Sequence, residues 1–209
     1  AIILISLIQY VPQVNTNIEK GALWKRLSTG YRFLKANPLL FIFGNASYAI
    51  FVVLIVEVHL LLPMYVNNHL GTGADVYASS EIFYAIGALL AGAGIRQLFQ
   101  STHTVKAIII LMAATVAMLY LCSFTRSTGI FYAFSFIIGV TNAGTRVLRV
   151  TYLFNHVPNE LMGRTGSVFS MINIFLRFLF ISLFSLPLFT TSNNVVYAYF
   201  LFGCFVLMA

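Results

Sequence analysis

The sequence predicts an all-α integral membrane protein. Of its 209 residues, 60% are hydrophobic and only 8% are charged. Soluble domains carry about 25% charged residues, so this chain lacks the polar surface that water requires. Its apolar runs are long and are separated by short polar segments, and a helix needs roughly 20 apolar residues to cross a bilayer core.

Several apolar runs are long enough to span a membrane. The expected spans are 38–66, 77–95, 105–123, 130–154 and 165–189. Residues 195–209 are expected to begin a further, truncated span, and residues 1–12 to form the end of a helix whose start lies upstream. Both ends of the chain fall inside apolar runs, so we expect part of a longer protein.

Residues 13–37 differ in kind, because they are rich in Lys and Arg. At 100° per residue, one arc of about 100° collects the apolar side chains Leu23, Trp24, Leu27, Tyr31 and Leu34. This pattern predicts an amphipathic helix lying on the cytoplasmic membrane face. The alternative is a plain polar linker with chance periodicity.

Positive charge is distributed unevenly among the alternating loops. One side has only Arg126, and the other has Lys20, Lys25, Arg26, Arg32, Lys35, Arg96, Lys106 and Arg164. Cytoplasmic loops carry an excess of Lys and Arg, which predicts that segment 13–37 and the loops near residues 100 and 160 are cytoplasmic. Topology therefore accounts for the net charge of +7, and no nucleic-acid partner is expected.

Polar residues inside the spans indicate a lined cavity, because charge in a membrane is costly and usually faces a bundle interior or water. In span 130–154, one face of about 80° carries Ser135, Gly139, Asn142, Arg146 and Arg149. Span 165–189 repeats this pattern with Gly166, Ser170, Asn173 and Arg177.

Candidate site residues follow from this pattern. The predicted substrate cavity comprises Asn45, Tyr48, Asn142, Arg146, Asn173 and Arg177. Arg149, near a cytoplasmic end, either belongs to a gate with Pro158 and Arg164 or extends its charge to the membrane surface. Glu57 either carries a proton or pairs at the outer interface.

Enzyme chemistry is not expected. The sequence contains no His-Glu-x-x-His pattern, no phosphate-binding glycine loop and no nucleophile elbow. Cys122 and Cys204 lie in apolar runs without metal-ligand spacing and are interpreted as small hydrophobic residues. No cofactor or metal is expected.

Two stretches carry a family resemblance. They are RLSTGYRFLKANPLL (26–40) followed by LLLPMYVNNHLG (60–71), and Arg149 followed by VPNELMGR (157–164). The chain resembles the C-terminal half of a major facilitator superfamily transporter, in the branch of enterobactin and macrolide exporters. The resemblance implies a six-helix bundle, helices seven to twelve, preceded by the tail of helix six at 1–12 and the linker 13–37. It also implies a missing N-terminal half as partner.

The resulting hypothesis is part of a secondary active transporter. We expect a proton-driven exporter of a drug-like or siderophore-like small molecule, working by alternating access in a bacterial inner membrane. An importer or another transporter class is the first alternative, and a membrane-embedded enzyme or a structural membrane subunit is the second. The expected partners are a small-molecule substrate and the lipid bilayer.

Overall fold

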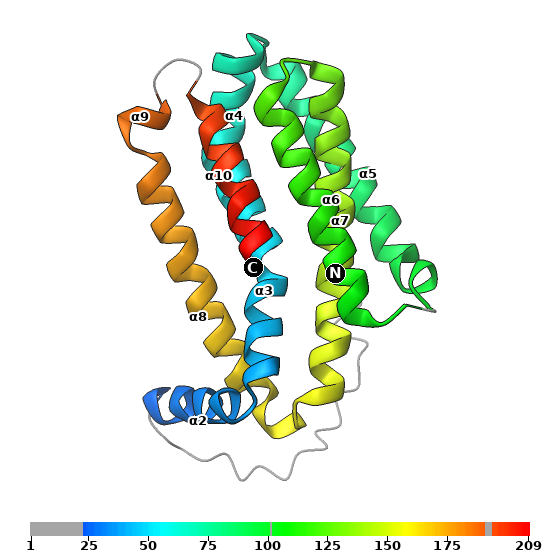
Figure 1. Ribbon diagram of the computed structural model, residues 1–209, viewed down its shortest axis with the longest axis vertical. Helices are drawn as coiled ribbons and strands as arrows, with labels where there is room; N and C mark the ends of the chain where they lie inside the picture. Colours follow the sequence, from blue (N-terminus) through cyan, green and yellow to red (C-terminus); the bar gives the residue numbers. More distant parts are fainter. Residues whose placement is uncertain (1–22, 101, 191–193) are drawn as a thin grey trace, which may run out of the picture.

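The computed structural model describes residues 23–100, 102–190 and 194–209, and the regular secondary structure of these residues is entirely helical (Figure 1). An all-α membrane fold is thereby confirmed. Among these residues, five helices are long and apolar enough to cross a membrane, and Val195–Met208 is a shorter apolar helix. The elements are α2 (Leu23–Ala36), α3 (Pro38–Val56), η1 (Glu57–Leu61), α4 (Leu62–Met64), η2 (Tyr65–Leu70), α5 (Ala74–Leu98), α6 (Thr104–Phe124), α7 (Thr128–His156), α8 (Asn159–Phe184), α9 (Pro187–Thr190) and α10 (Val195–Met208).

The long helices run side by side, and α2 lies across one end of the bundle (Figure 1). The first span is one continuous helical stretch, Pro38–Leu70. Within it the backbone is α-helical except at η1 and η2, where it is π-helical. It begins with Pro38 at the first helical turn, where a missing N–H costs nothing. It ends at Gly71, whose φ of 65° lies in the left-handed region that glycine adopts without strain.

The helices extend further into the connections than the sequence suggested. We predicted loops over segments 67–76 and 155–164, yet α5 begins at Ala74 and α8 at Asn159. Asp75 and Glu160 lie in the first turns of these helices, where a negative charge stabilises the helix N-terminus. Polar residues at these positions therefore start helices instead of marking loops.

The last long span ends earlier than expected. We predicted a continuous helix over 165–189, but α8 stops at Phe184 and the separate turn α9 begins at Pro187. Proline disfavours helical backbone in the residue before it and cannot donate a backbone hydrogen bond, so the chain bends near Leu186.

Small residues permit a close helix crossing between α5 and α7. A Cβ added to Gly87 would lie 2.2 Å from the carbonyl oxygen of Phe136, and one added to Gly139 would lie 2.2 Å from that of Tyr84. Only glycine permits this approach of two backbones, as small residues do at membrane helix interfaces generally.

Helix α2 has the predicted amphipathic character, but only part of its apolar face packs against the bundle. Leu34 is buried and Leu27 is half-buried, whereas Trp24 is 75% exposed and Tyr31 is 52% exposed. Gly30 brings α2 close to α8, since a Cβ there would lie 2.5 Å from the carbonyl oxygen of Arg164. The predicted helix end at 1–12 and linker residues 13–22 lie outside the described residues.

Candidate functional site

Arg149 joins two of the central helices. It projects from α7 and is 5% exposed, so it does not extend to the membrane surface. Its Nη1 donates to the backbone carbonyl of Ser47 on α3 at 2.7 Å. Its guanidinium lies 3.7 Å from the centre of the Tyr48 ring, a cation–π arrangement. A hydrogen bond and a ring together replace part of the hydration that burial removes.

Helix α8 reaches the same region through Phe169. The Phe169 ring centre is 6.1 Å from that of Tyr48 and 6.4 Å from that of Phe41. Gly44 makes room for it, because a Cβ at this position would lie 2.2 Å from the Phe169 ring. Tyr48 therefore lies between the guanidinium of α7 and the aromatic ring of α8, and it links three helices.

Further along α8, Asn173 and Arg177 lie one turn apart. Arg177 is half-buried, donates from Nε to the carbonyl oxygen of Asn173 at 3.4 Å, and has its guanidinium 5.5 Å from the Phe51 ring centre. Asn173 is 2% exposed, and neither its Nδ2 nor its Oδ1 has a hydrogen-bond partner among the described residues. An unpaired buried amide is costly and requires a polar partner in the working protein.

The remaining predicted cavity residues are dispersed. Asn142 donates to the hydroxyl of Tyr84 on α5 at 3.1 Å. Asn45 donates to the carbonyl oxygen of Phe41 in its own helix. Arg146 is exposed. The structure thus brings Tyr48 to Arg149 and Asn173 to Arg177, but places Asn142 in a separate α5–α7 contact.

Glu57 occupies a second polar centre. It lies in η1, is 2% exposed, and accepts a hydrogen bond from the Tyr199 hydroxyl of α10 at 3.0 Å. A cavity of about 10 Å³ adjoins it, whose polar lining also includes Ser80, Glu81 and Tyr84. That volume accommodates about one water molecule. Glu57 is therefore paired inside the bundle rather than at an interface.

The other two predicted gate residues lie at the α2 end of the bundle. Pro158 precedes α8, and Val157 before it has the extended backbone that proline favours. Arg164 is half-buried, with its backbone against Gly30 of α2. Both are thus located at the junction of α7, α8 and α2.

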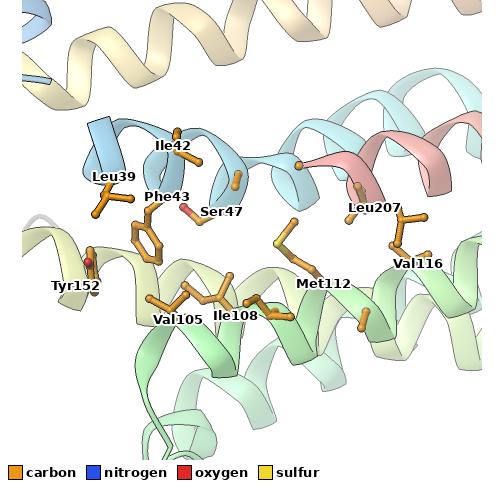
Figure 2. A pocket seen from close by; sticks show the side chains of 15 residues that line it. Leu39, Ile42, Phe43, Ser47, Val105, Ile108, Met112, Val116, Tyr152 and Leu207 are labelled. Carbon is orange, nitrogen blue, oxygen red and sulfur yellow. The ribbon is translucent and has the colours of Figure 1, made fainter. Parts of the chain in front are cut away.

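An open cavity of about 530 Å³ lies between α3 and α6, and Ser47, the partner of Arg149, is among the residues that line it (Figure 2). Leu39, Ile42 and Phe43 face it from α3, and Ile108 and Met112 face it from α6. None of the predicted substrate-cavity residues lines it. Its apolar lining suits an apolar occupant and not a charged substrate.

Residues 1–180 match the family model described as Major Facilitator Superfamily. The chain belongs to the major facilitator superfamily. No curated protein and no solved structure matches it. Major facilitator proteins are secondary transporters and not enzymes, and five helices able to cross a membrane agree with a multi-pass membrane protein.

In this major facilitator chain, several polar contacts were absent from the sequence prediction. Tyr199 and Tyr84 are the partners of Glu57 and Asn142, and the Ser47 carbonyl is the partner of Arg149. A tyrosine in an apolar span is weak evidence for a polar contact, because its largely apolar ring is equally typical of a hydrophobic core. A backbone carbonyl has no sequence signal at all.

Proposed function

We propose that the chain forms the C-terminal six-helix bundle of a proton-driven exporter of anionic drug-like or siderophore-like molecules. In this proposal the chain belongs to the branch of enterobactin and macrolide exporters. The bundle works by alternating access against an N-terminal bundle, in a bacterial inner membrane, with segment 13–37 cytoplasmic.

The pair Asn173 and Arg177 supports this proposal most directly. Asn173 is buried with both polar side-chain atoms unpaired, and the adjacent Arg177 is only half-buried. A guanidinium offers bidentate donors to a carboxylate or to the oxygens of a catecholate. The two side chains therefore form an incomplete polar site that an anionic group completes, aided by residues of the second bundle.

Glu57 supports proton coupling. A carboxyl group inside a membrane bundle is expensive and is typical of proton relays. Its tyrosine partner and the small cavity shared with Glu81 connect it to polar groups of α5 and α10. The π-helical segment that carries it agrees, since such bulges occur frequently at functional sites.

Arg149 supports the gate. Its contact with Ser47 and Tyr48 fixes α7 to α3, near the end of the bundle where α2, Pro158 and Arg164 lie. A contact controls access only if it differs between the two states of the transporter. We propose that this contact is made in one state and broken in the other.

Transport in proteoliposomes tests the proposal. The full-length protein receives an imposed pH gradient, and paired compounds are offered that differ by a carboxylate or catecholate group. We expect export of the anionic member only, driven by protons moving the opposite way. Arg177→Ala should abolish this selectivity, and Arg177→Lys should restore it in part, because lysine keeps the charge but loses the planar fork. Uptake along the proton gradient would indicate an importer, and normal transport by Arg177→Ala would refute this site.

A further inference from the structure

A groove between α2 and α8 lies apart from the proposed substrate site. It has a volume of about 320 Å³ and is lined by Trp24, Leu27, Ser28, Tyr31, Val168, Met171 and Ile172. Nearly all of this lining is apolar, and it includes the Ser28 side chain. Trp24 is 75% exposed and Met171 is 57% exposed, so the groove is open to the surroundings.

The rim of the groove on α2 is strongly basic. Helix α2 carries Lys25, Arg26, Arg32 and Lys35 and has no acidic residue. At 100° per residue, Lys25, Arg32 and Lys35 fall within about 80° of one another, directly beside the arc of Trp24 and Tyr31. These three side chains are exposed. Helix α2 therefore has three adjacent faces. The first packs on α8, the second carries the aromatic side chains and the third carries the basic ones.

The groove lies on the side of α8 that faces away from the proposed substrate site. On a helical wheel, Val168 and Met171 are about 120–180° from Arg177. From Met171 the apolar surface continues along α8 through Phe175 and Phe178, which are 64% and 69% exposed. A long apolar chain that enters the groove can thus extend along the helix.

We propose that this groove binds an anionic phospholipid. The phosphate group lies beside Lys25, Arg32 and the Ser28 hydroxyl, and one acyl chain occupies the groove between Trp24 and Met171. Aromatic rings above an apolar chain and basic side chains beside a phosphate match the two ends of such a lipid. Charge complementarity selects an anionic headgroup over a zwitterionic one. The bound lipid covers apolar surface that protein contacts leave open and holds α2 against α8.

Quenching of Trp24 fluorescence measures this binding directly. Trp24 is the only tryptophan of the chain, and any tryptophan elsewhere in the full-length protein is changed to Phe. The protein is placed in phosphatidylcholine vesicles that contain a small fraction of brominated phosphatidylglycerol or, in parallel, brominated phosphatidylcholine. We expect phosphatidylglycerol to quench at severalfold lower mole fraction, and high salt to reduce this preference.

Two variants and a control locate the site. Lys25→Gln with Arg32→Gln should remove most of the preference, since each basic residue near an anionic headgroup contributes about fivefold. Arg96→Gln with Lys106→Gln changes two exposed basic residues at the α5–α6 connection and should leave it intact. Met171→Gln should weaken quenching by both lipids and keep their ratio.

Equal quenching by the two lipids, or a preference that survives Lys25→Gln with Arg32→Gln, would overturn the proposal. Quenching requires no substrate and no proton gradient. Its outcome is therefore independent of the proposed export activity, and either proposal can fail alone.

Discussion

Arg149 of α7 is hydrogen-bonded to the backbone carbonyl of Ser47 on α3, with 2.7 Å between Nη1 and the oxygen. These two residues are 102 positions apart in the chain. Because the guanidinium also covers the Tyr48 ring, this single side chain connects two membrane helices at the end of the bundle near α2.

Removal of the Arg149 contact should destabilise the bundle. Arg149→Ala is expected to lower its stability by about 1.5–3 kcal/mol, the range for a hydrogen bond made by a charged group, measured as a fall in melting temperature in detergent. Arg146→Ala is the matched control, since Arg146 is exposed one turn earlier on the same helix. An equal, small effect of both substitutions would show that the buried contact is energetically unimportant.

The gate hypothesis makes a separate prediction for the same residue. In the full-length transporter, Arg149→Ala should raise the labelling rate of a cysteine introduced at Asn173, because the substitution removes a contact that is made in only one of the two states. Labelling is measured in vesicles with and without substrate. Unchanged rates in both conditions would count against a gating role.

Glu57 and Tyr199 should act as a unit. Glu57→Gln is expected to abolish transport driven by a pH gradient while substrate exchange persists. Tyr199→Phe leaves a buried carboxyl oxygen without its donor, which costs about 1–3 kcal/mol of stability and slows proton-driven transport. Tyr197→Phe is the control, because Tyr197 is 58% exposed on the same helix. Full proton-driven transport by Glu57→Gln would exclude Glu57 from coupling.

Adding a Cβ atom at the α5–α7 crossing should destabilise the protein. Gly139→Ala is expected to cost about 1–3 kcal/mol, since the new Cβ meets the Tyr84 carbonyl and backbone cannot move aside as a side chain can. Gly92→Ala lies in the facing helix with nothing within 4 Å and should be neutral or slightly stabilising. Thermal unfolding of the two variants in detergent provides the comparison. A similar melting temperature for both would contradict the close crossing.

Orientation is tested by labelling introduced cysteines from either side. In a background without Cys122 and Cys204, cysteines at Lys25, Arg96 and Asn159 should react only from the cytoplasm, and one at Asn68 only from outside. All four positions are exposed. The expectation rests on the Lys and Arg asymmetry of the loops. The reverse pattern would invert the proposed topology.

Sequence patterns were sufficient for the membrane class and for the approximate positions of the long helices. Hydrophobic length and the spacing of small residues depend on local composition, which the chain carries directly. The precise helix ends were harder to predict, because α5 and α8 begin inside polar segments that we had interpreted as loops, with Asp75 and Glu160 in their first turns.

The sequence by itself determined that the protein is a helical membrane bundle with polar side chains in particular spans. Only the tertiary structure decided which of these residues meet: Arg149 with Ser47, Glu57 with Tyr199, and Asn142 with Tyr84. It also decided that the open cavity between α3 and α6 is mostly apolar, and that of these six residues only Ser47 lines it. Helical periodicity assigns a residue to a face of its own helix, whereas its partner depends on how distant helices cross and rotate against one another, which is a property of the packed bundle.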